Sequence, residues 1–160
     1  MKGKKWDDPF VFIIGIGNAY RSDDAVGLHV AQCLKKQAHD HVYVLEESGE
    51  GLSLMESWKD ADTVILIDAV YSGARPGTIL RFDARDQPIP SNLFHYSTHA
   101  FGVAETIELA RALNQLPNRL IVYGIEGKCF EAGAGLSVEV DKAVQEVTIR
   151  VQQDIRNSGI

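Results

Sequence analysis

The hydrophobic positions of this chain alternate between short, mainly apolar runs and longer stretches with an apolar residue every three or four positions. Runs of the first kind are typical of strands buried on both faces, as in parallel sheets; they cover residues 10–14, 41–45, 63–67 and 120–125. Residues 78–82 alternate apolar and polar side chains, which predicts a strand at the edge of a sheet. Helical spacing occupies residues 26–36, 52–58, 99–114 and 137–155.

Strands and helices alternate along nearly all of the 160 residues, with no internal repeat and no linker. This order favours a doubly wound α/β domain, in which helices cover both faces of a mostly parallel, twisted sheet. We therefore expect a single three-layer domain over residues 1–160, with a sheet of about five strands. Residues 1–8 are expected to form a flexible tail.

Charge and cysteine content narrow the function classes. The net charge of −6 argues against binding to nucleic acid or to an anionic membrane. No apolar run approaches the roughly 20 residues that span a bilayer, so we expect no membrane insertion. Cys33 and Cys129 are far apart and outside any Cys-x-x-Cys pattern, which predicts neither a disulfide framework nor a zinc site. We expect a cytoplasmic monomer, and a catalytic role for Cys129 stays open.

The first apolar run ends in a glycine-rich turn, residues 15–18 (Gly-Ile-Gly-Asn), and two aspartates follow, Asp23 and Asp24. The glycines are expected to turn the backbone at the carboxyl end of the strand, where open α/β sheets bind their ligands. Ser22 is a candidate N-cap, with both aspartates in the first turn of a helix. A dinucleotide-binding fingerprint is excluded because Tyr20 occupies its third glycine position.

Three side chains from different parts of the chain are expected to meet at this edge. Asp24 follows the first strand, Asp68 follows the third, and His99 begins the third long helix. Because the carboxyl ends of parallel strands share one edge, all three could face one cleft. Two carboxylates and an imidazole suit a divalent transition metal. The alternative is that the aspartates only cap turns or helices and that the histidine is structural.

The whole pattern resembles that of the hydrogenase maturation endopeptidases. The resemblance rests on residues 15–27 (Gly-Ile-Gly-Asn, then Asp-Asp-x-x-Gly), on residues 65–69 ending in Asp-Ala, and on the Ser-x-His-x-x-Gly segment at 97–102. It extends to the last strand and the following helix start, residues 123–126 and 135–137.

The resemblance implies a peptidase, sometimes grouped with the aspartic-type endopeptidases, that removes a C-terminal extension from the precursor of a nickel-iron hydrogenase large subunit after nickel insertion. It assigns both metal binding and catalysis to Asp24, Asp68 and His99. The nickel is expected to arrive with the substrate, although other divalent metals could occupy the site.

One segment departs from the family pattern. Many members have Asp-Gly-Gly-Thr after the second strand, whereas residues 46–51 read Glu-Glu-Ser-Gly-Glu-Gly. Glu46, Gly49 and Gly51 are the candidate substrate-binding residues, and the difference suggests another hydrogenase partner or cleavage motif.

Two further functions stay open at this point. A nickel-sensing chaperone would grip the same precursor without cutting it, and its metal ligands would be identical. A peptidyl-tRNA-hydrolase-like esterase also begins with a Gly-x-Gly-Asn strand end, but the acidic charge disfavours an RNA substrate.

Overall fold

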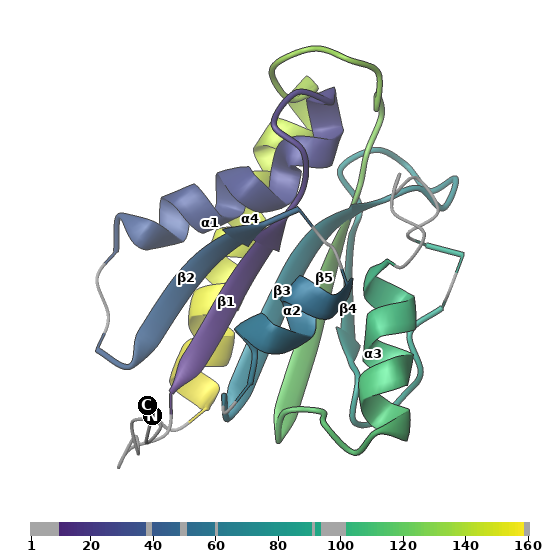
Figure 1. Ribbon diagram of the computed structural model, residues 1–160. Coiled ribbons are helices and arrows are strands. Elements are labelled where there is room, and N and C mark those ends of the chain that lie inside the picture. The colour runs from purple at the N-terminus through teal and green to yellow at the C-terminus, as the bar shows by residue number, and fades with distance from the viewer. Residues whose placement is uncertain are drawn as a thin grey trace.

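A computed structural model describes residues 10–37, 40–48, 51–59, 61–90, 92–93 and 102–158. These residues form a five-stranded sheet in the order β2-β1-β3-β5-β4 (Figure 1). The strands are β1 (Val11–Ile16), β2 (Val42–Glu47), β3 (Thr63–Val70), β4 (Ile79–Asp83) and β5 (Arg119–Glu126). The helices are the short 3₁₀ helix η1 (Ser22–Ala25), α1 (Val26–Lys35), α2 (Gly51–Ser57), α3 (Val103–Ala112) and α4 (Val138–Asn157).

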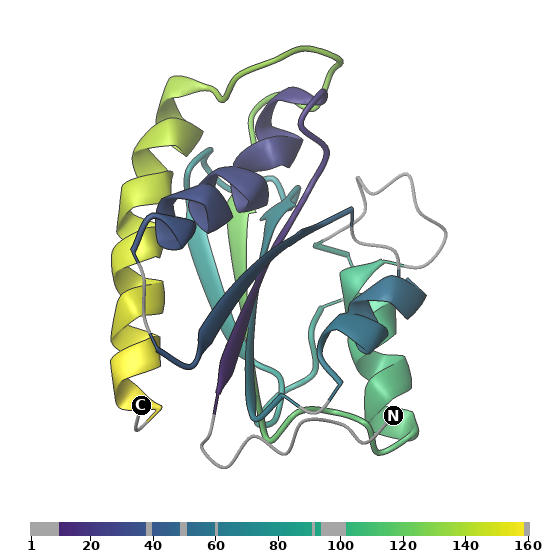
Figure 2. The ribbon, with the colours of Figure 1, turned by 60° about the vertical axis from the view of Figure 1, so that its left-hand side comes forward.

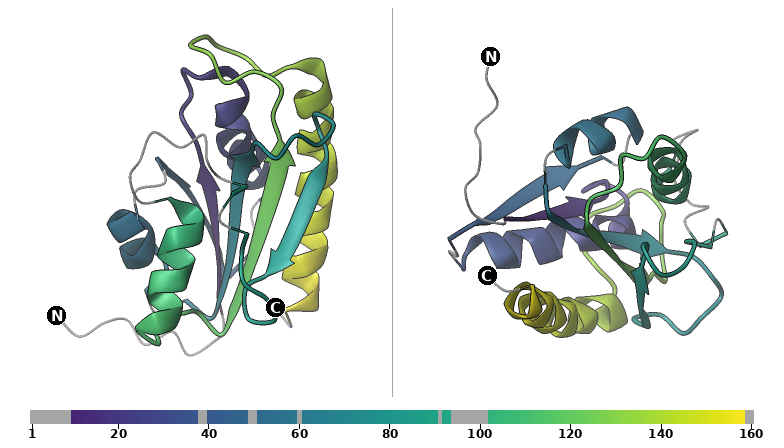
Figure 3. Two further views of the ribbon diagram at one scale, coloured as in Figure 1. Left: turned by 90° about the vertical axis from the view of Figure 1, so that its right-hand side faces the viewer. Right: turned by 90° about the horizontal axis from the view of Figure 1, so that it is seen from below.

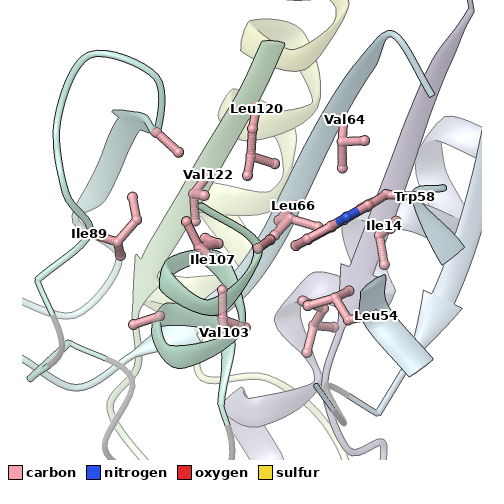
Figure 4. Close-up of a cluster of buried hydrophobic side chains, with 14 of the residues drawn as sticks. Ile14, Leu54, Trp58, Val64, Leu66, Ile89, Val103, Ile107, Leu120 and Val122 are labelled. Carbon is pink, nitrogen blue, oxygen red and sulfur yellow. The ribbon is translucent and has the colours of Figure 1, made fainter. Parts of the chain in front are cut away.

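The helices cover the sheet from both sides, which confirms the predicted fold class. Figure 2 shows α1 and α4 against one face and α2 and α3 against the other, and the view from below in Figure 3 shows the three layers. Alternate residues of each buried strand enter different clusters: Ile65 and Ile67 pack with α1 and α4, whereas Val64 and Leu66 pack with α2 and α3. Figure 4 shows the second of these clusters, in which Trp58 lies beside Leu66. The period of two explains why the central strands are apolar throughout.

Strand pairing also follows the prediction at the sheet edge. All pairs are parallel except β4 with β5, which run antiparallel, as the left view of Figure 3 shows. Two boundaries differ from expectation. β3 continues to Val70, so Asp68 lies inside the strand, and α3 begins at Val103 with Gly102 at its N-cap position. The predicted tail at residues 1–8 lies outside the described residues.

Gly15, Gly17 and Gly27 allow close packing, and the sharp turn that the sequence assigned to Gly15 and Gly17 is not made by either of them. Neither Gly15 nor Gly17 has a positive φ. A β-carbon on Gly15 would lie 2.2 Å from the carbonyl oxygen of Gly27, and one on Gly17 would lie 2.1 Å from that of Asp24. On Gly27 it would lie 2.3 Å from the carbonyl oxygen of Ile67. The absence of these three side chains therefore lets η1 and α1 rest directly on the backbones of β1 and β3.

A buried ionic cluster joins α4 to strands β4 and β5. Asp154 is 6% exposed and accepts hydrogen bonds from Tyr123 Oη and from Arg81 Nη2, the latter at 2.8 Å. Burial, followed by the hydrogen bond to this carboxylate, raises the pKa of Tyr123. No helix within the described ranges combines the length and hydrophobicity needed to cross a membrane.

Candidate functional site

Asp24 and Asp68 meet because the carboxyl edge of the sheet is staggered. The β1–β3 pairing ends at Gly15 and Ile67, whereas the β3–β5 pairing continues for three more residues. Asp68 is the first residue of β3 after its pairing with β1 has ended. Helix η1, which carries Asp24, contacts β3. Two residues that are 44 positions apart in the sequence are thus brought to one place by the register of the sheet.

The two carboxylates repel each other at this place. The pKa of Asp68 is raised well above its ordinary value of 3.8, first because burial removes water from the carboxylate and second because Asp24 carries a like charge. The backbone amide of Ala69, which donates to Asp68 Oδ1 at 2.8 Å, offsets only part of this effect. Asp24 Oδ2 accepts from the backbone amide of Asn18 at 3.0 Å. The arrangement can share a proton or hold a cation between its oxygens.

The third predicted ligand, His99, lies outside the described residues, as does Gly49. Helix α3, which follows His99 in the chain, packs on the face of the sheet to which the alternation of Val64 and Leu66 also assigns Asp68. Among the described residues, no group of three or more His, Cys, Asp and Glu side chains could hold a metal ion. The complete triad therefore stays a prediction.

Asp23 does not cap its own helix, which corrects the role that the sequence suggested. Its side chain is fully buried and accepts from the backbone amides of Lys128, Cys129 and Ser137 at 2.8, 3.0 and 2.8 Å. The Ser137 hydroxyl donates to both carboxylate oxygens, at 3.1 and 2.9 Å. Burial alone would raise the pKa of Asp23, but these hydrogen bonds outweigh it and lower the pKa below 3.8.

Ser22 is not an N-cap either. The N-cap position of η1 is Arg21, and no side chain caps that helix. The Ser22 hydroxyl donates to the carbonyl oxygen of Glu131 at 2.8 Å, and its backbone amide donates to that of Gly133 at 3.0 Å. Ser137 does occupy the N-cap position of α4, as predicted for the start of that helix, although its hydroxyl serves Asp23.

A second buried carboxylate at this edge had no assigned role in the sequence analysis. Glu126, at the end of β5, is 1% exposed and accepts from the amides of Ser72 and Gly73 at 2.9 and 3.0 Å, and from the Ser72 hydroxyl at 2.8 Å. It thereby fixes the loop that follows β3. The available signals were its position directly after an apolar run and its place within residues 123–126 of the family resemblance.

The candidate substrate-binding segment begins with an engaged carboxylate. Glu46 Oε2 lies 2.6 Å from Lys35 Nζ, and Glu46 Oε1 accepts from Gln32 Nε2 at 3.0 Å. The hydrogen bond from Lys35, followed by that from Gln32, lowers the pKa of Glu46. Gly51 is the first residue of α2. These contacts orient Glu46 toward α1, and its role in substrate binding stays a prediction.

The relatives of this chain include several hydrogenase maturation proteases. Residues 28–153 match the model of a family described as hydrogenase maturation protease. The hydrogenase 2 maturation protease of Escherichia coli is 25% identical over 154 residues, covering 94% of this chain and 93% of that protein. A hydrogenase maturation protease (putative in its description) of Methanocaldococcus jannaschii is 33% identical over 145 residues, covering 85% and 90%.

Solved structures agree on the fold. The hydrogenase maturating endopeptidase HybD from E. coli superposes with a TM-score of 0.80 over 94% of both chains, at 22% identity. HybD from Thermococcus kodakarensis gives a TM-score of 0.72 over 90% of this chain and 97% of that one, at 24% identity. The family match covers most of the chain, and the fold and the relatives agree with it. This chain therefore belongs to the hydrogenase maturation protease family.

Proposed function

We propose that this endopeptidase removes the C-terminal extension of a nickel-iron hydrogenase large-subunit precursor once nickel has been inserted. Membership of the family makes the chain a peptidase. The observation that carries the rest is the pair of carboxylates, Asp24 and Asp68, which lie close enough for the charge of Asp24 to raise the pKa of Asp68. A cation would relieve this repulsion, and oxygen ligands with one imidazole suit a divalent metal.

The nickel is part of the substrate in this proposal. Asp24 and Asp68, with His99, would contact it and so place the scissile peptide at the edge of the sheet. Two mechanisms fit these residues. In one, the metal polarises the scissile carbonyl or activates the attacking water. In the other, a carboxylate takes a proton from water as the C–O bond forms, and the proton passes to the leaving amine as the C–N bond breaks; the metal then serves only for recognition.

The proposal is tested by incubating the protein with nickel-loaded and nickel-free precursor and measuring the mass of the C-terminus. We expect shortening only of the loaded form. Asp24→Asn and His99→Ala should slow it by about 100-fold or more, the range typical of lost acid–base groups. Asp86→Asn, at an exposed turn after β4, is the control and should cut normally.

Other results would point elsewhere. Tight precursor binding with no shortening by the unaltered protein would favour the nickel-sensing chaperone. Release of tRNA from peptidyl-tRNA would favour the esterase. Normal cutting by both site variants would refute the assignment of the site.

We also propose that Glu46, Gly49 and Gly51 contact the precursor. Glu46→Ala should weaken precursor binding several-fold, because it removes the carboxylate that is proposed to contact the precursor. The maximal rate should stay unchanged, since the exposed ion pair of Glu46 with Lys35 contributes only about 0–1 kcal/mol to folding. Lys35→Ala is the matched control: it breaks the same pair but keeps the Glu46 carboxylate, and should bind normally. Precursor binding is measured by titration calorimetry. Equal weakening of binding by both variants would show that the ion pair, and not a contact between Glu46 and the precursor, is responsible.

We also propose that the protein is a cytoplasmic monomer. Cys33 and Cys129 are free thiols, which is consistent with a reducing compartment.

A further inference from the structure

We propose that Asp23 is a positioning residue for the reaction: it clamps residues 127–137, the segment between β5 and α4, against η1 and thereby holds the neighbouring Asp24 opposite Asp68. This inference rests on the proposed function. It assigns Asp23 no contact with the substrate, and it separates the two adjacent aspartates into one that acts and one that anchors.

The clamp is dense and specific. Within the described part of the chain, every donor to Asp23 comes from the 127–137 segment: three backbone amides and one hydroxyl, from Lys128, Cys129 and Ser137. The backbone amide of Asp23 returns a hydrogen bond to the carbonyl oxygen of Cys129 at 2.9 Å. A carboxylate bound by several backbone amides is a strong, directional anchor, because charge-assisted hydrogen bonds are roughly twice as strong as neutral ones.

The same segment is bonded to the residues on either side of Asp23. Tyr20 and Ser22 exchange backbone hydrogen bonds with Gly133, and Arg21 Nε donates to the carbonyl oxygen of Phe130 at 3.3 Å. Figure 1 shows the two loops running side by side above the sheet. Residues 20–23 are thus held along their whole length by a segment more than 100 positions away in the sequence.

The held conformation is one that the chain would not adopt unaided. Ser22 has a φ of 52°, in the left-handed region that costs a non-glycine residue free energy. Ser22 is the first residue of η1, so its backbone sets the direction of the next two side chains. Asp23 enters the clamp, whereas Asp24 accepts the hydrogen bond from the Asn18 amide and lies close enough to Asp68 to raise its pKa. Strain and like-charge repulsion at one point, held by a dense network beside it, are typical of a functional site.

The test compares two buried carboxylates. Asp23→Asn keeps the shape but turns an amide group toward backbone donors. Asp154→Asn is the matched control, because it weakens a buried network of similar density between α4 and the strands β4 and β5. Both are measured at a temperature where circular dichroism shows full folding. Single-turnover cleavage of nickel-loaded precursor, at several enzyme concentrations, separates the maximal rate from binding.

We expect Asp23→Asn to lower the maximal rate at least tenfold with less than a twofold change in half-saturating concentration, and Asp154→Asn to leave both unchanged. Amide hydrogen exchange gives a readout that needs no activity. The Asn18 amide, which donates to Asp24, should exchange at least tenfold faster in Asp23→Asn and at the normal rate in Asp154→Asn.

Equal rate losses in the two variants, or unchanged exchange at Asn18, would overturn the positioning role. If Asp23→Asn does not fold, Ser137→Ala replaces it: this change removes only the hydroxyl bonds and should accelerate Asn18 exchange in the same direction, whereas no acceleration would count against the clamp. If the unaltered protein cuts no precursor, the proposed function fails, while the exchange experiment still decides whether Asp23 positions Asp24.

Discussion

Replacing Gly27 with alanine is expected to lower the free energy of unfolding by at least about 3 kcal/mol, the upper range for overpacking. The added β-carbon would lie 2.3 Å from the carbonyl oxygen of Ile67 and 2.4 Å from that of Ile16. Both atoms belong to the backbones of central strands, so no flexible side chain can move aside. Helix α1 would have to lift off the sheet, and η1 with it. Urea titration followed by circular dichroism measures the loss.

The control for this substitution is Gly73→Ala. Gly73 has a φ of 83°, and a β-carbon there would meet no atom within 4 Å. Its cost is therefore only that of a left-handed residue, about 1–2 kcal/mol. Equal losses of stability in the two variants would show that α1 can shift easily on the sheet. The close approach at Gly27 would then not be what holds α1, and the preceding η1 with Asp24, in place.

Asp68→Asn is expected to abolish processing and, at neutral pH, to raise the melting temperature. Asparagine can still accept the hydrogen bond from Ala69, but it carries no charge to be buried or repelled by Asp24. Processing should fall by about 100-fold or more, because the removed carboxylate is proposed to act in the reaction. The melting temperature should rise by several degrees, since about 1 kcal/mol corresponds to roughly 2–4 °C in a protein of this size.

The pH dependence of this gain has a defined sign. The folded-state pKa of Asp68 lies above the ordinary value of 3.8, so the folded protein binds more protons than the unfolded chain between the two values. Stability therefore falls as pH rises through that window, and the penalty is complete above the folded-state pKa. The stability difference between variant and unaltered protein should grow over the same window in thermal melts at a series of pH values. A variant that is less stable at neutral pH, or that still cuts, would contradict this account of Asp68.

The sequence was sufficient for the parts of the molecule that depend on local pattern. Unbroken apolar runs located the central strands, and the alternation at 78–82 placed β4 at an edge, where it is found. The convergence of Asp24 and Asp68 followed from one rule about parallel strands, although β3 proved longer than its apolar run because Asp68 sits opposite Gly124 within the ladder.

Two features of the candidate site depend on contacts that no local pattern carries. Asp23 reads as a helix-capping residue beside Ser22, yet its partners lie 105 to 114 positions later in the chain. Glu126 likewise bonds to Ser72 and Gly73, more than 50 positions earlier. The prediction for Gly15 and Gly17 was wrong for a different reason. A glycine pair after a strand indicates a turn, but here the missing side chains allow helix and sheet to approach closely, and only the packed structure defines that distance.

The chemistry of the Asp23 clamp has a consequence for how this protein family can diversify. Three of its four donors are backbone N–H groups, which every amino acid except proline supplies. The backbone hydrogen bonds to Asp23 therefore do not depend on which side chains stand at positions 128 and 129, provided that no proline enters. Such a scaffold allows the outer surface of the segment to adapt to different partners while the backbone hydrogen bonds that hold Asp23 are kept.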